Sequence, residues 1–266
     1  MKPKKEKTEK VEKEQVTEEH EEEKEVFEAS EVVDVISEEE IKAVSEDKDV
    51  EKIKISSTFN AETWKPKTKT GMRVKNKEIV NIDQLLDEGK TILEAEIVDA
   101  LIPNLTNDLL LIGQAKGKFG GGQRRIFRQT QKKTREGNKP KFTTYAIVGD
   151  QDGHIGSGRG KSKETVPARE KAIRNAKRNI IKIRRGCGSW QCNCKTPHSI
   201  PFAVEGKCGS VKLRILPAPK GTGLIVQKEC AKMLKLAGIK DAWSEVEGQT
   251  GSAINLMDAC FTALKQ

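Results

Sequence analysis

The sequence has few aromatic residues and no long apolar run. Aromatic residues make up 4% of the 266 residues and hydrophobic residues 35%, against 33% charged. So little apolar material argues against a single large hydrophobic domain such as an enzyme barrel. Apolar runs such as Leu109–Ile112 are far shorter than the roughly 20 residues that span a bilayer. The basic N-terminus leads into acidic residues rather than an apolar signal, so we expect a cytoplasmic protein without membrane association.

Charge is divided unevenly along the chain. Residues 1–50 hold 9 lysines and 19 acidic residues, whereas the remainder holds 40 basic and 21 acidic residues, a net charge of +19. A cationic globular part favours a polyanion as the partner. The acidic segment has one aromatic residue, Phe27, and we expect it to be a disordered tail. The tail either shields a basic face or is a solvated extension.

The chain then changes from a basic arm to short helices. Pro and Gly in Trp64–Gly71 favour an extended arm. Asn81–Gly89 has the pattern of a short helix with asparagine at its N-cap and glycine after its end, and Glu94–Leu101 places apolar residues at helical spacing. These segments are too small to be catalytic scaffolds.

Three strand-like segments precede a long basic helix. The expected strands are Ile126–Gln131, Phe142–Val148 and His154–Ser157. A polar loop, 132–140, separates the first two, and a glycine-rich basic turn, 158–161, is expected to open a helix from about Glu164 to Ile181. Small and apolar residues form one stripe of that helix, which leaves Lys177 and its other cations largely outside. The pattern predicts a β-β-β-α unit.

Two basic segments of this unit are candidate RNA contacts. Arg159, Lys161 and Lys163 flank the expected helix start, where backbone N–H groups favour phosphate oxygens. The loop between the first two strands adds Lys132, Lys133, Arg135, Lys139 and Lys141. Proteins recognise RNA duplexes largely through shape and phosphates, so RNA is favoured over DNA. The alternatives are a solvated helix face and a mobile hairpin.

A cluster of soft ligands follows the basic helix. Cys187, Cys192, Cys194 and His198 lie within twelve residues and form a set typical of structural zinc, although the Cys-x4-Cys and Cys-x-Cys spacings are irregular. The alternative is a loop of reduced thiols in which His198 packs or binds phosphate. The three remaining cysteines, Cys208, Cys230 and Cys260, are expected in the core.

Strand-like segments at Ser199–Glu205 and Ser210–Leu216 and two helices, one ending near Gly238 and one from about Ile254 to Leu264, predict a second α/β unit. The turn Lys220–Gly223 lacks the spacing of a phosphate-binding loop and is interpreted as a tight strand-to-helix turn. No Ser/His/acid set or carboxylate pair indicates catalysis.

Long motifs occur in a fixed order: 148–164 (VGDQDGHIGSGRGKSKE), 184–186 (RRG), 197–201 (PHSIP) and 216–223 (LPAPKGTG). Over roughly residues 64–265 they resemble the fifth small-subunit ribosomal protein family, the S-five family. Trp64–Thr68, Glu96–Asp99 and Cys187–Trp190 are similar to its archaeal branch. The segment from about Gln114 to Gln129 looks longer than is usual in that family, so the start of the first strand is left open.

The resemblance implies a non-enzymatic structural constituent of the small ribosomal subunit. Such a protein binds small-subunit ribosomal RNA, borders the channel through which messenger RNA enters, touches the fourth and eighth small-subunit ribosomal proteins and supports translational accuracy. It implies RNA contact at Arg184 and Arg185 in addition to the eight cations above. An RNA-modifying enzyme or kinase that carries a double-stranded-RNA-binding module is the alternative.

The expected fold class is α+β with two domains. The resemblance implies an N-terminal domain similar to double-stranded-RNA-binding domains and a C-terminal domain with a left-handed β-α-β fold. The predicted boundaries are 1–60 for the disordered acidic tail, 61–118 for the basic arm with short helices, 119–185 for the first domain and 186–266 for the second.

Overall fold

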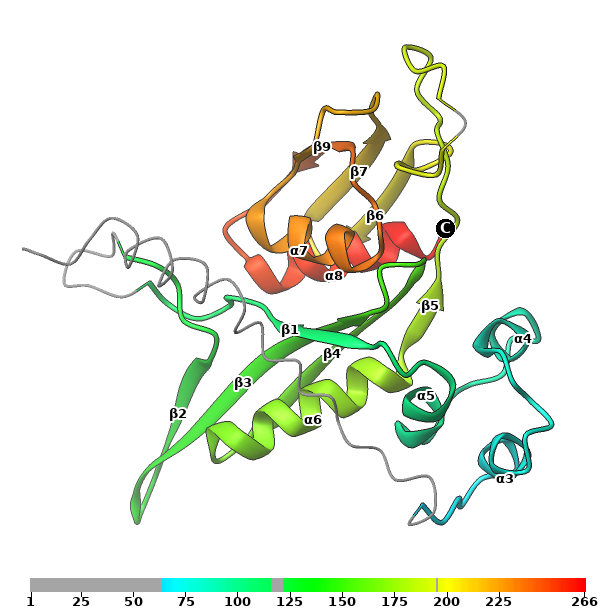
Figure 1. Cartoon of the computed structure of the whole chain (residues 1–266). Helices are drawn as coiled ribbons and strands as arrows, with labels where there is room; N and C mark the ends of the chain where they lie inside the picture. Colours follow the sequence, from blue (N-terminus) through cyan, green and yellow to red (C-terminus); the bar gives the residue numbers. More distant parts are fainter. Residues whose placement is uncertain (1–63, 116–121, 195) are drawn as a thin grey trace, which may run out of the picture. The chain divides into compact units, whose positions relative to one another are not determined.

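The computed structural model describes residues 64–115, 122–194 and 196–266 (Figure 1). The predicted acidic tail, 1–60, lies outside the described residues, and so do residues 116–121 of the segment from about Gln114 to Gln129. In the part of the chain that is described, no helix has the length and apolarity to cross a membrane.

Three short helices form the first described segment: α3 (Lys69–Lys75), α4 (Ile82–Asp87) and α5 (Glu96–Leu101). The helix predicted over Asn81–Gly89 is confirmed as α4, with Asn81 at its N-cap. Apolar residues from all three helices, including Val74, Leu85 and Ile97, form one buried cluster with Ile180. This helical segment is therefore packed onto the sheet that follows.

The predicted β-β-β-α order is confirmed by β2 (Arg128–Thr134), β3 (Gly137–Gly149), β4 (His154–Ser162) and α6 (Thr165–Arg178). Two further strands join the same sheet, β1 (Thr106–Leu109) and β5 (Ile180–Lys182). The strand order is β1-β3-β4-β5, and β2 pairs with the N-terminal half of β3. All pairs are antiparallel. One strand of the sheet, β1, therefore comes from the segment predicted to be a basic arm with short helices, 61–118.

The glycine-rich basic turn expected at the start of the helix is a strand, so this prediction was wrong. Gly156, Gly158 and Gly160 alternate along β4 and face α6. A Cβ atom added at each would lie 2.0–2.2 Å from a backbone atom of α6. Alternate glycines in a strand therefore mark close approach of another backbone, not a phosphate-binding turn.

Lys177 of α6 was also predicted wrongly. Its side chain is 11% exposed, and its Nζ lies 2.5 Å from Oδ1 of Asp99 in α5. This buried ion pair connects α6 to the helical segment. The other cations predicted outside the apolar stripe of this helix, Lys171, Arg174 and Arg178, are exposed as expected.

The C-terminal unit has a four-stranded mixed sheet with the order β6-β7-β9-β8. Its elements are β6 (Val204–Cys208), β7 (Val211–Pro217), β8 (Leu224–Ile225), α7 (Lys228–Leu236), β9 (Ala242–Glu247) and α8 (Ala253–Leu264). β8 and β9 are parallel with α7 between them, which gives a β-α-β unit. The turn 220–223 lies between β7 and β8, not directly before the helix as predicted.

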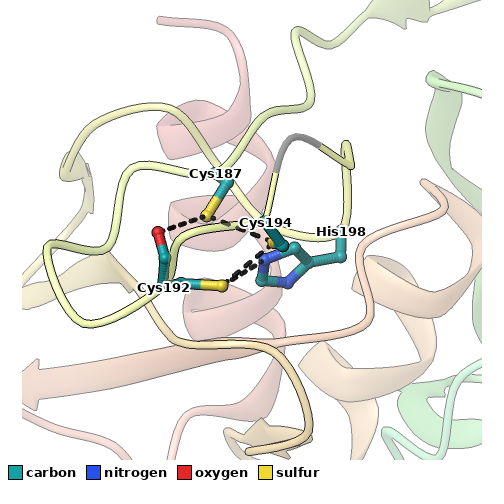
Figure 2. Close-up of side chains that lie close together, drawn as sticks. All are labelled: Cys187, Cys192, Cys194 and His198. Atoms are coloured by element: carbon teal, nitrogen blue, oxygen red, sulfur yellow. Dashed lines mark hydrogen bonds between the residues drawn. The ribbon is translucent and has the colours of Figure 1, made fainter.

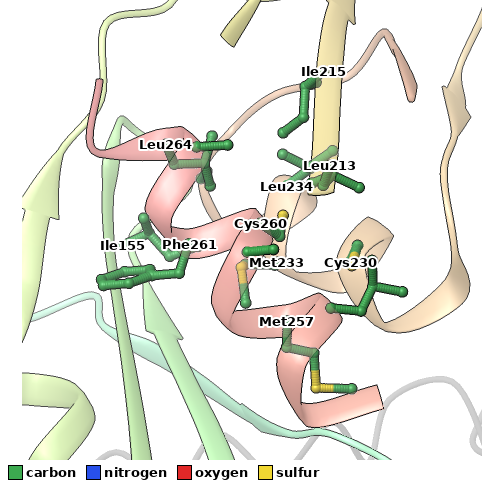
Figure 3. Packing of buried hydrophobic residues seen from close by; sticks show 14 of the residues in the cluster. Ile155, Leu213, Ile215, Cys230, Met233, Leu234, Met257, Cys260, Phe261 and Leu264 are labelled. Atoms are coloured by element: carbon green, nitrogen blue, oxygen red, sulfur yellow. The ribbon is translucent and has the colours of Figure 1, made fainter. Parts of the chain in front are cut away.

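The two units share one hydrophobic core. Tyr145 and Ile147 of β3 belong to the same buried cluster as Met233 of α7 and Phe261 of α8. The intervening residues Ala146 and Val148 of β3 belong to a separate cluster with α6. Figure 3 shows Ile155 of the first sheet beside Phe261. Because strand side chains alternate between faces, one face of the first sheet packs on α6 and the other on the C-terminal unit.

Candidate RNA interface and metal centre

The β2–β3 hairpin extends beyond the sheet as a two-stranded ribbon. Residues 137–141 of β3 pair only with β2, because pairing with β4 begins at Phe142. Thr134 pairs with Gly137, so Arg135 and Glu136 form a two-residue turn, where a longer loop over 132–140 was predicted. Gly137 has a φ of +113°, a conformation that favours glycine. None of the three hydrophobic clusters among the described residues includes a residue of 128–141, and Figure 1 shows this end of the hairpin extending beyond the other strands of the sheet.

The hairpin cations are exposed and few have acidic partners. Lys132, Lys133, Arg135, Lys139 and Lys141 are all exposed. Among the described residues only Lys139 has an ion pair, with Glu136 at 2.6 Å. Lys132 lies directly opposite Lys139 across the two strands, and like charges in that arrangement repel each other. A polyanion would remove this repulsion, so the geometry suits a phosphate backbone.

The other predicted RNA contacts lie on β4, just after it, and after β5. Lys161 is exposed on β4, Lys163 is exposed after the strand, and Arg184 is exposed after β5. Two arginines already have protein partners. The guanidinium of Arg159 pairs with Asp258 of α8 and lies 5.8 Å from the centroid of the Tyr145 ring. Arg185 donates hydrogen bonds to the carbonyls of Gln151 and Asp152 and pairs with the Asp152 carboxylate.

Cys187, Cys192, Cys194 and His198 converge on one point, and Figure 2 shows their side chains facing one another. The Sγ atoms of Cys192 and Cys194 are 3.0 Å apart, those of Cys194 and Cys187 are 3.6 Å apart, and Cys192 Sγ is 3.7 Å from His198 Nε2. All four potential ligand atoms lie within 4.8 Å of one another. The irregular sequence spacing thus still brings the four ligands together.

The donor set fits a tetrahedral metal ion. Zinc–sulfur bonds of about 2.3 Å in a tetrahedron place two sulfur atoms about 3.8 Å apart. The 3.6 Å between the sulfur atoms of Cys187 and Cys194 is close to this value, whereas the 3.0 Å between those of Cys192 and Cys194 is shorter. His198 directs Nε2 at the thiols, while its Nδ1 lies 2.7 Å from Oδ2 of Asp241. A carboxylate on the far nitrogen of a ligating histidine fixes the ring's tautomer and orientation. The four residues could therefore hold a metal ion.

The thiols differ in acidity. Partial burial and its two thiol neighbours raise the pKa of Cys187 to about 11. Hydrogen bonds from Cys192 and Thr196 lower the pKa of Cys194 to about 6. Because the thiolate is the metal-binding form of cysteine, the lowered pKa of Cys194 favours its metal-binding form.

Asp241 is the residue of this site that the sequence analysis missed. It is buried, lies directly before β9, and is 43 residues from His198 along the chain. Its second carboxylate oxygen, Oδ1, accepts hydrogen bonds from the backbone N–H groups of Gly221 and Gly223. Those N–H groups are thus engaged within the protein, which gives a phosphate-cradle interpretation of the glycine turn no support.

Comparison with known proteins confirms the resemblance. The family model for the N-terminal domain of ribosomal protein S5 matches residues 126–184, and the model for its C-terminal domain matches residues 206–266. Small ribosomal subunit protein uS5 of Nanoarchaeum equitans is 50% identical over 207 residues, which cover 78% of this chain and 89% of that protein. The same protein of Methanocaldococcus jannaschii is 44% identical over 207 residues, which cover 78% of this chain and 88% of that protein. That of Methanococcus maripaludis is 42% identical over 218 residues, which cover 82% of this chain and 89% of that protein. The chain therefore belongs to the ribosomal protein S5 family, in its archaeal form.

Proposed function

We propose that this protein is a structural constituent of the small ribosomal subunit in the cytoplasm, where it binds small-subunit ribosomal RNA. The observation that carries the proposal is the exposed hairpin, whose cations have one acidic partner among the described residues. The names of its relatives, small ribosomal subunit protein uS5, support the same role. The protein acts by neutralising phosphates and fitting RNA shape rather than by catalysing a reaction.

The RNA contacts proposed are the ten cations of the hairpin, of β4 and the residue after it, and of the segment after β5. They are Lys132, Lys133, Arg135, Lys139, Lys141, Arg159, Lys161, Lys163, Arg184 and Arg185. Eight of them, the five hairpin cations with Lys161, Lys163 and Arg184, have exposed side chains that can reach phosphates. Among the five hairpin cations only Lys139 has an ion pair with a described residue, Glu136. Arg159 and Arg185 would contribute mainly by orienting the surfaces that they connect, because their guanidinium groups already bind protein oxygens.

Family membership supports a finer placement. We propose that the protein borders the channel through which messenger RNA enters, touches the fourth and eighth small-subunit proteins, and supports translational accuracy. A projecting basic ribbon on a rigid sheet is suited to reach between RNA helices from such a position.

Sedimentation tests the proposed function. In a cell lysate fractionated on a sucrose gradient at high salt, the protein should migrate with small ribosomal subunits. Phosphate contacts weaken with salt, but a structural constituent also fits the shape of the folded RNA and should stay bound at salt concentrations that release loosely bound basic proteins. An unrelated basic protein that binds RNA loosely is the control and should move to the top of the gradient. Slow sedimentation of this protein under conditions that leave subunits intact would contradict the proposal.

We also propose that the Cys/His cluster binds structural zinc. Three thiols and an imidazole form a closed ligand set, as in structural zinc sites, with no position left for a substrate. Elemental analysis of the purified protein should give about one zinc per chain, and Cys192→Ser should release it while Cys208→Ser, outside the cluster, should not. A metal-free native protein would eliminate the zinc site without affecting the RNA-binding proposal.

A further inference from the structure

A basic pocket lies beside the Cys/His cluster, where the turn between β3 and β4 meets the C-terminal unit. Its volume is about 980 Å³. Four cationic residues from separate segments line it: Arg185, Lys220, Lys235 and Lys240. The one carboxylate in the lining is Asp241. The pocket therefore has an excess of positive charge on its wall.

The three lysines are not neutralised by neighbouring carboxylates. Lys220, Lys235 and Lys240 are exposed, and no described residue forms an ion pair with any of them. Asp241 is buried and its two carboxylate oxygens already accept hydrogen bonds from His198 and from the 221–223 backbone. The lysine ammonium groups thus remain available to an anion from outside.

Asp241 connects the wall of this pocket to the Cys/His cluster. Its Oδ2 lies 2.7 Å from His198 Nδ1, while its Oδ1 accepts from Gly221 N at 3.1 Å and Gly223 N at 2.8 Å. Both glycines have positive φ values, +91° and +75°, which turn their N–H groups toward the carboxylate. Lys220 directly precedes them, so the position of this lysine depends on Asp241.

The chain around Lys240 is tied to the same histidine. The backbone N–H groups of Lys240 and Asp241 both donate to the carbonyl of His198, at 2.8 and 3.2 Å. The Ser199 hydroxyl in turn donates to the carbonyl of Asp241 at 2.6 Å. Two of the three lysines are thus positioned by bonds that converge on His198 and Asp241.

We infer that this pocket binds phosphate groups of an RNA backbone and that the metal-held Cys/His loop positions two of its lysines, Lys220 and Lys240, through Asp241. The inference rests on the proposed function and adds three lysines of the C-terminal unit, Lys220, Lys235 and Lys240, to the RNA contacts proposed above. The volume exceeds that of a single phosphate and accommodates a sugar-phosphate segment. His198 is the only aromatic ring in the lining and both its nitrogens are engaged, so the pocket offers no stacking surface for a base and reads the backbone alone.

The double variant Lys220→Ala/Lys240→Ala tests the pocket. Affinity for archaeal small-subunit ribosomal RNA is measured across a salt series with full-length protein. Removal of up to two phosphate contacts should lower the slope of log affinity against log salt by about 1.5. The matched control is Lys207→Ala/Lys212→Ala, which removes the same charge from exposed positions on β6 and β7 and should leave the slope unchanged.

Asp241→Asn tests the connection to the cluster. This variant should weaken metal binding about 10- to 100-fold, as removal of a carboxylate behind a metal-ligating histidine does. It should also lower RNA affinity in the otherwise native protein, yet have no further effect when Lys220 and Lys240 are already alanine, because coupled sites give non-additive changes. Retained RNA affinity after metal release would overturn the connection.

The outcomes separate this inference from the proposed function. If the native protein fails to bind the RNA, the proposed function fails first. If native binding and the hairpin contribution behave as expected but the pocket variant retains the native slope, the pocket inference alone is overturned. A pocket variant that keeps its RNA affinity but no longer joins small subunits would assign the pocket to an acidic protein partner and would also overturn it.

Discussion

The β2–β3 hairpin and strand β4 both carry basic residues that the sequence predicts as RNA contacts, yet the fold uses the two segments in opposite ways. The hairpin leaves its cations exposed, and among the described residues only Lys139 forms an ion pair with a carboxylate. β4 directs its alternate glycines against α6, and it places Arg159 against Asp258 and His154 between two aspartates. A basic, glycine-rich sequence is therefore not by itself a phosphate site. What decides its role is whether another element covers the strand.

The largest effect expected concerns the covered face of β4. Gly158→Ala would place a Cβ atom 2.2 Å from the backbone nitrogen of Ala176, so helix α6 would have to move. Overpacking of this kind costs about 3 kcal/mol or somewhat more. Thermal unfolding followed by circular dichroism should show a melting temperature lower by roughly 10 °C.

Lys161→Ala is the matched control because it lies on the same strand with its side chain exposed. Its effect on the melting temperature should be small, as for most exposed substitutions. If Gly158→Ala were as stable as Lys161→Ala, the glycines of β4 would not be required for the packing of α6. The conclusion that β4 is covered by a helix whereas the hairpin is free to bind RNA would then be wrong.

The hairpin should respond in the opposite way. The triple variant Lys132→Ala/Lys133→Ala/Lys141→Ala should retain the native melting temperature, since none of the three side chains has an ion pair among the described residues. Its affinity for archaeal small-subunit ribosomal RNA should fall. The slope of log affinity against log salt should decrease by about 2 to 3, because each lysine that no longer neutralises a phosphate lowers it by about one.

The control for the hairpin is Lys207→Ala/Lys212→Ala/Lys228→Ala, which removes three exposed lysines elsewhere. It should leave the salt slope near that of the native protein. Equal decreases in affinity for the two triple variants would mean that overall charge, rather than the projecting hairpin, drives RNA binding.

The order of the main elements could be predicted from the sequence because it depends on local patterns. The strand run Phe142–Val148 has β-branched and aromatic residues, and the helix after it has an apolar stripe; both were found. The four metal-ligand candidates were also predicted, because soft ligands within twelve residues can converge whatever the exact loop conformation.

Features that depend on distant packing could not be predicted. β1, with the sequence Thr-Asn-Asp-Leu, has no alternating apolar pattern and exists because it pairs with the end of β3. Glycines of β4 suggest a turn by local propensity, and only the backbone of α6 explains them. Asp241 carries no local signal, since its partner His198 is 43 residues away.

The smallest effect expected is a pH-dependent contact at the start of β4. His154 Nδ1 lies 2.5 Å from Asp150 Oδ2, and its Nε2 lies 2.9 Å from Oδ1 of Asp83 on α4. The hydrogen bond to Asp150, followed by that to Asp83, raises the pKa of His154 above its ordinary value of 6.5 although burial opposes it. Burial acts against ionised Asp150, but hydrogen bonds from His154 and two backbone N–H groups still lower its pKa.

The signs of these shifts define a pH window. The raised pKa of His154 gives stability that is complete below about pH 6.5 and is lost as pH rises through the folded value. The lowered pKa values of Asp150 and Asp83, the latter due mainly to its hydrogen bond from His154, give stability that is present above their ordinary value of 3.8 and is lost as pH falls through the folded values. The contact should therefore be strongest between about pH 4 and 6.5.

The variant His154→Gln measures this contribution. Its free energy of unfolding in urea should be lower than that of the native protein by about 1.5–2 kcal/mol at pH 5.5, the lower part of the range for hydrogen bonds to charged groups. The difference should shrink above pH 7. Lys182→Met is the control, because Lys182 also pairs with Asp83 but does not titrate in this range; its effect should be constant from pH 5.5 to 8.5. A difference for His154→Gln that stays constant over the same range would show that the imidazole acts by packing alone, as the glycines of β4 do.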